Sequence, residues 1–99
     1  MKELLSTIIE FERILKKYPD QRNYAFEFFS FFKYLQRLKF PSDVVPIIEI
    51  GAILKYEKPI IFHELRNYAS RSPMIEIVTT VEMDFKQAKQ KIDSIKSNL

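Results

Sequence analysis

The sequence predicts a single, mostly helical α+β domain over residues 1–99, with one small β-sheet. Three observations lead to this fold class. Apolar residues recur at helical spacing at both ends of the chain, an aromatic-rich segment occupies residues 24–34, and residues 75–83 alternate between apolar and polar side chains. A chain of 99 residues has the usual length of one domain, which fits this organisation.

The N-terminal half predicts two helices. Residues 2–18 should form an amphipathic helix, and its apolar face contains Leu4, Ile8, Phe11, Leu15 and Tyr18. Pro19 ends this helix, and Asp20 is placed to cap a second helix over residues 21–39. Seven aromatic residues between 24 and 34 make the second helix apolar on nearly all sides. It must therefore be central, covered by the rest of the chain or by a second copy.

Residues 44–56 can be interpreted in two ways. Their branched side chains suit a β-strand, but Pro46 suits the first turn of a helix better than a central strand. The three apolar residues Ile47, Ile50 and Leu54 also have helical spacing. We therefore favour a helix here, followed by a short helix over residues 60–70.

Residues 75–83 are the strongest candidate for a strand. One face would carry Ile75, Ile77, Val81 and Met83, and the other face would carry Glu76, Thr80 and Glu82. A lone strand cannot satisfy its backbone hydrogen bonds. Its partner would be residues 44–50, residues 58–63, or the same strand of another subunit. Asp84 can then cap a final helix over residues 85–98.

Composition limits the classes of protein to which the chain could belong. No cysteine is present, which excludes disulfides and thiolate metal sites and favours an intracellular setting. No apolar stretch approaches the roughly 20 residues that span a membrane, and the N-terminus lacks the pattern of a signal peptide. The formal net charge is +3, and the last fourteen residues alone carry +3. This mild excess of cations is compatible with a solvated helix face or with nucleic-acid contacts.

Residue usage has a pattern of its own. Isoleucine is the commonest apolar residue, Gly51 is the single glycine, and Cys and Trp are missing. In length and usage the chain resembles the small proteins of unknown role from filamentous and rod-shaped viruses of thermoacidophilic archaea. The resemblance implies a thermostable homodimer located in the host cytoplasm.

The candidate site residues concern binding, and no catalytic, cofactor or metal site is predicted. The expected dimer interface consists of Phe26, Phe28, Phe29, Phe31, Phe32 and Leu35. Lysine meets phosphate and glutamine can read adenine, so a DNA-binding surface is a second expectation. Its contacts would be Lys86, Gln87, Lys89, Gln90, Lys91 and Arg71. A helix–turn–helix over residues 57–82 is another form of the same idea.

His63 and Glu64 begin like the helix motif of zinc proteases, but Asn67 stands where that motif needs a second histidine. His63 could also act as a general base towards Ser70 or Ser72. The expected function is therefore a non-enzymatic, highly stable homodimer that binds another macromolecule. A basic, dimeric, helix–turn–helix-like DNA-binding protein is the alternative, and a small hydrolase that uses His63 is the third.

Overall fold

The computed structural model describes residues 2–37, 46–80 and 82–98. Within these residues the chain forms six α-helices and two 3₁₀-helices, and it contains no strand. In chain order these are α1 Lys2–Lys17, η1 Arg22–Tyr24, α2 Ala25–Arg37, α3 Ile47–Glu57, α4 Pro59–Leu65, η2 Arg66–Arg71, α5 Pro73–Thr80 and α6 Phe85–Ser97.

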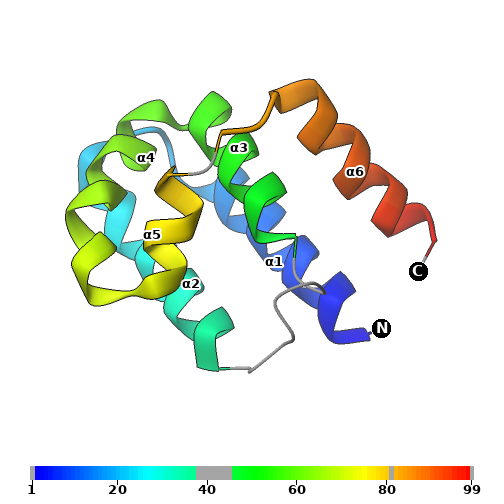
Figure 1. The fold of residues 1–99 in the computed structure, drawn as a ribbon, viewed down its shortest axis with the longest axis horizontal. Helices are drawn as coiled ribbons and strands as arrows, with labels where there is room; N and C mark the ends of the chain where they lie inside the picture. The colour runs from blue at the N-terminus through cyan, green and yellow to red at the C-terminus, as the bar shows by residue number, and fades with distance from the viewer. Residues whose placement is uncertain (1, 38–45, 81, 99) are drawn as a thin grey trace.

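Helix α3 lies at the centre of the molecule (Figure 1). It contacts α1, α4, α5 and α6, and its residues 49–54 are all buried. Helices α1 and α2 lie on one side of α3, and α4, η2 and α5 cover α2. Helix α6 packs along α3, from the stacked rings of Tyr56 and Phe85 to the ion pair of Glu49 with Lys91. The sequence analysis expected the aromatic helix over residues 21–39 at the centre, whereas the structure has α3 there. The aromatic α2 exposes Phe26 and Tyr34 to solvent, whereas α3 is covered on all sides along most of its length.

The predicted strand over residues 75–83 is wrong, because residues 73–80 form helix α5. Pro73 occupies the first turn, and the hydroxyl of Ser72 accepts a hydrogen bond of 3.3 Å from the Ile75 N–H. The buried residues Ile75, Val78 and Thr79 follow helical spacing, and Ile77 is 47% exposed although it was expected beside Ile75. A helix satisfies its own backbone groups, so no partner strand is needed. Val81 lies outside the described residues.

The other helices agree with the sequence in type. The ambiguous segment is helix α3, as favoured, and Pro46 directly precedes it. The predicted helix over 85–98 is confirmed as α6, and Asp84 caps it by accepting a 3.1 Å hydrogen bond from the Gln87 N–H. The described part of the predicted helix over 21–39 begins with the 3₁₀ turn η1. Positions 38–39 and 44–45 of the predicted helices lie outside the described residues.

Asp20 caps a different helix from the one expected. Its two carboxylate oxygens accept hydrogen bonds from the backbone N–H groups of Ile60 and Ile61, at 3.1 and 2.9 Å. These N–H groups belong to the first turn of α4, where no intrahelical acceptor exists for them. The loop after α1 is thereby joined to a helix forty residues further along the chain.

Candidate functional site

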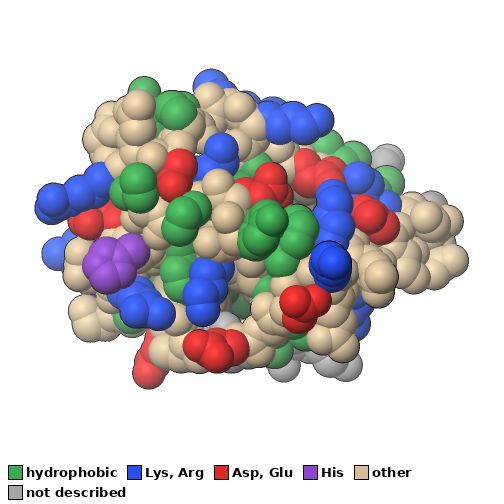
Figure 2. Space-filling model, turned by 90° about the horizontal axis from the view of Figure 1, so that it is seen from above, with side chains coloured by type: hydrophobic (Ala, Val, Ile, Leu, Met, Phe, Trp, Pro, Cys, Tyr) green, Lys and Arg blue, Asp and Glu red, His purple; other side chains and the backbone are tan. Residues whose placement is uncertain are grey.

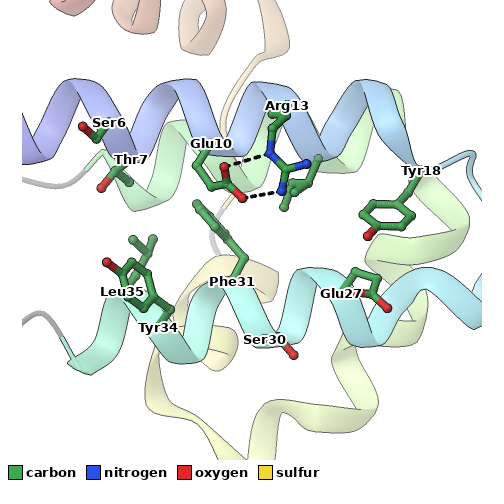
Figure 3. A pocket seen from close by; sticks show the side chains of 11 residues that line it. Ser6, Thr7, Glu10, Arg13, Tyr18, Glu27, Ser30, Phe31, Tyr34 and Leu35 are labelled. Atoms are coloured by element: carbon green, nitrogen blue, oxygen red, sulfur yellow. Dashed lines mark hydrogen bonds and ion pairs between the residues drawn. The ribbon is translucent and has the colours of Figure 1, made fainter.

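A groove of about 710 Å³ lies between α1 and α2, which run in opposite directions along its sides (Figure 3). Its floor is apolar and includes Ile14, Phe31 and Leu35. Its rims carry Ser6, Thr7, Glu10 and Arg13 from α1, Tyr18 beyond the end of α1, and Glu27, Ser30 and Tyr34 from α2. We refer to this feature as the α1–α2 groove. It is open to solvent and has the form of a docking surface rather than an enclosed substrate cavity.

Glu10 and Arg13 form the main polar feature of the groove. The guanidinium donates two hydrogen bonds to the carboxylate, at 2.9 and 2.7 Å. Figure 3 shows this pair facing Phe31 across the groove. The hydrogen bond from Arg13, aided by its charge, lowers the pKa of Glu10, and the same bond raises the pKa of Arg13. Both groups therefore stay ionised at neutral pH, and neither is free to act as an acid or a base.

The structure divides the six expected interface residues among three locations. Phe28 and Phe32 are fully buried inside the chain. Phe31 and Leu35 contribute to the floor of the α1–α2 groove while also packing in the core. Phe26 and Phe29 lie on another surface, where Phe26 is 57% exposed. The chain itself covers most of its aromatic run, so these six residues do not form one continuous interface.

Phe26 and Phe29 belong to a surface that α2 builds together with η2. The ring centroids of Phe26 and Phe29 are 6.2 Å apart, and those of Phe29 and Tyr68 are 4.7 Å apart. The Lys33 ammonium lies 5.9 Å from the Phe29 ring, and the Arg71 guanidinium lies 5.9 Å from the Tyr68 ring. We define these five residues as the α2–η2 surface. Nothing in the sequence links Tyr68 to Phe29, so sequence reasoning missed this residue.

The expected DNA-contacting residues are not brought together. Helix η2, which ends at Arg71, lies at the opposite end of the molecule from α6 (Figure 1). On α6, Lys91 lies 2.9 Å from the buried carboxylate of Glu49, and Lys89 lies 3.7 Å from Asp93. The remaining members of the expected set on α6 are Lys86, Gln87 and Gln90, which are exposed. On the face drawn in Figure 2, Lys and Arg side chains alternate with Asp and Glu and form no continuous basic patch.

The stretch expected as a helix–turn–helix is helical, but its second helix is unsuited to DNA. Helix α5 has only eight residues, and it buries Ile75 and Val78 in the core. The residues that it exposes include Glu76 and Ile77. A carboxylate on the reading face would repel the phosphate backbone.

His63, the single histidine, is exposed on α4 (purple in Figure 2) beside a shallow hollow of about 510 Å³. The neighbouring carboxylate of Glu64 pairs with Arg22 at 3.0 Å. The hydroxyl of Ser72 is buried and donates to the Gln36 side chain at 2.7 Å, so it is not available as a nucleophile. Among the described residues, no group of three or more His, Cys, Asp or Glu side chains could hold a metal ion.

Comparison of the chain with protein-family models, with curated proteins and with solved structures finds no match. The resemblance to small archaeal viral proteins therefore stays a prediction. No helix in the described part of the chain is both long and apolar enough to cross a membrane.

Proposed function

We propose that this chain is a non-enzymatic binding protein that works as a homodimer, in which a second copy docks into the α1–α2 groove. The observation that carries the proposal is the groove itself. An apolar floor that includes Phe31 and Leu35 lies open between two helices, and the exposed ring of Tyr34 stands at its edge. Aromatic side chains that fill a partner's pocket are the usual energetic centre of a protein interface.

The charges on the rim favour a second copy as the occupant. Glu10 and Glu27 supply negative charge, and Arg13 supplies positive charge. In a two-fold dimer the same surface faces itself, so it must carry both signs to be complementary. Arg13 neutralises Glu10, so Glu27 leaves the rim with a net negative charge, which would repel a nucleic acid. The acids and the base together therefore support self-association over binding of an anionic polymer at this groove.

The groove is long enough for this purpose. Helices α1 and α2 have 16 and 13 residues, which correspond to about 24 and 20 Å of helix. A stable dimer buries on the order of 1,200 Å² or more in total. The proposed dimer would therefore have to bury the outer faces of α1 and α2 along this length, in addition to the groove itself.

Sedimentation equilibrium tests the proposal. We expect the wild-type chain to have twice the 11.9 kDa mass of one chain at micromolar concentration. Tyr34→Ala removes an exposed contact at the groove, and Ser6→Trp fills it from the α1 rim, so both should shift the mass towards the monomer. Ile60→Ala, which truncates a similarly exposed side chain on α4, is the matched control and should stay dimeric. A monomeric wild type, or variants that all remain dimeric, would exclude this interface.

Two other functions rank lower. Duplex DNA binding through α6 would rely on Lys86, Gln87 and Gln90, because Lys89 and Lys91 are paired with acids. A hydrolase that uses His63 has no support in the geometry, since His63 forms no hydrogen bond or ion pair with a described residue. We further propose an intracellular location and high thermal stability, which the cysteine-free, isoleucine-rich sequence favours.

A further inference from the structure

The α2–η2 surface combines rings and cations in one continuous array. Phe26, Phe29 and Tyr68 follow one another at centroid distances of 6.2 and 4.7 Å. Phe26 is more than half exposed, and the other two rings are partly exposed. The rings are therefore accessible at one end of the array and held in place by the core at the other. This is a rigid platform whose outermost ring is free to stack on a flat ligand.

Positive charge surrounds the rings. Lys33 and Arg71 lie over Phe29 and Tyr68, and Arg37 follows Lys33 by one helical turn on the same exposed side of α2. Arg22 lies at the other end, beside a small hollow that Phe26 and Tyr68 also line. The acid in this hollow is Glu64, which Arg22 neutralises at 3.0 Å. The surface thus has a net positive charge, unlike the mixed rim of the α1–α2 groove.

We propose that the α2–η2 surface binds single-stranded nucleic acid. An unpaired base would stack on the exposed face of Phe26, neighbouring bases would contact the exposed edges of Phe29 and Tyr68, and phosphates would contact Lys33, Arg37 and Arg71. Base–aromatic stacking combined with a basic track is how proteins bind single strands without reading sequence. In a duplex the bases are stacked on one another, so they cannot stack on the aromatic side chains of this surface. This inference goes beyond the proposed homodimer and uses other residues.

Fluorescence anisotropy with a labelled oligothymidylate of about 20 nucleotides tests the site across roughly 50–200 mM salt. Phe26→Ala should weaken binding about tenfold and leave the salt dependence unchanged, because it removes stacking and no charge. Phe26→Trp should restore the affinity. Lys33→Gln and Arg71→Gln should each reduce the slope of log affinity against log salt by about 0.7, as expected for one lost phosphate contact on a single strand. Lys16→Gln on α1 and Ile60→Ala on α4 are the matched controls and should bind like the wild type.

Three results would overturn the inference. The first is an affinity for the oligonucleotide that Phe26→Ala leaves unchanged. The second is equal or tighter binding of a duplex of the same length. The third is loss of dimer mass in Phe26→Ala, which would make the surface a contact between copies. The proposed homodimer fails separately. A monomeric wild type, or an unchanged dimer mass in Tyr34→Ala, would exclude the homodimer, whereas the effect of Phe26→Ala on oligonucleotide binding would remain.

Discussion

The ammonium group of Lys91 lies 2.9 Å from the carboxylate of Glu49, whose side chain is only 7% exposed. This pair joins α6 to the central helix α3. A lysine that the sequence suggested for DNA binding is thus used to neutralise a buried charge. A second lysine of α6, Lys96, similarly donates to both carboxylate oxygens of Glu12 on α1, at 3.0 Å.

The first prediction concerns this pair. Lys91→Met should lower the free energy of unfolding by about 1–3 kcal/mol, because it leaves a buried carboxylate without its partner. Lys89→Met is the control, since its pair with Asp93 is exposed on both sides and should contribute less than about 1 kcal/mol. Urea denaturation of the two variants measures the difference. Equal stability of both would show that Lys91 does not support Glu49.

The second prediction concerns the close contact between α3 and α5. A Cβ atom at Gly51 would lie 2.8 Å from the backbone oxygen of Val78 and 3.1 Å from its Cγ1 atom. Alanine normally stabilises a helix relative to glycine by about 1 kcal/mol. Here Gly51→Ala should instead destabilise the protein by about 1–3 kcal/mol, because the backbone of α5 must move away. Thermal denaturation tests this, and a raised melting temperature would contradict it.

The third prediction concerns Asp20. Asp20→Ala should cost about 1–2 kcal/mol, because the N–H groups of Ile60 and Ile61 lose their acceptors at the start of α4. Amide hydrogen exchange should accelerate at these two positions rather than at the start of α2. Faster exchange confined to residues 22–25 would instead support the cap that the sequence suggests.

The fourth prediction concerns pH. The hydrogen bond from Arg13 holds the pKa of Glu10 below its ordinary value of 4.5. A carboxyl group with a lowered folded-state pKa stabilises the protein above its unfolded pKa, and this contribution is lost as the pH falls through the folded value. Arg13→Met should therefore reduce the loss of melting temperature between about pH 5 and pH 3. The change should be small, since both groups are about half exposed, and identical pH profiles for variant and wild type would exclude it.

Local signals in the sequence correctly located most helices. The apolar spacing of α1 and α6, Pro46 before α3 and the Asp84 cap are all visible without a structure. The wrong prediction of a strand at residues 75–83 has a local cause. In so short a segment, apolar β-branched residues fit the two-residue repeat of a strand as well as the 3.6-residue repeat of a helix. What decides for a helix is burial of Val78 and Thr79 against α3 and the hydrogen bond from Thr79 to the Ile75 carbonyl at 2.7 Å.

The candidate sites depend on contacts between residues that are far apart in the sequence, and the sequence alone does not predict these contacts. Helices α1 and α2 contact each other through Phe11 and Phe31, whose ring centroids are 5.9 Å apart, and the groove lies beside this contact. The apolar faces of the two helices predict the contact but not the groove. The α2–η2 surface joins residues 26–33 to residues 68–71, and no pattern in either segment predicts its contact with the other. The lysines of α6 can be recognised in the sequence. The acidic partner of Lys91, Glu49, lies in a mostly apolar helix, and no pattern in the sequence predicts the pair.

The most direct test of the account is the mass of the wild-type chain in solution, measured beside Tyr34→Ala by sedimentation equilibrium at micromolar concentration. We expect twice the mass of one chain for the wild type and a shift towards 11.9 kDa for the variant. A wild-type chain that sediments as a monomer at all concentrations would contradict it.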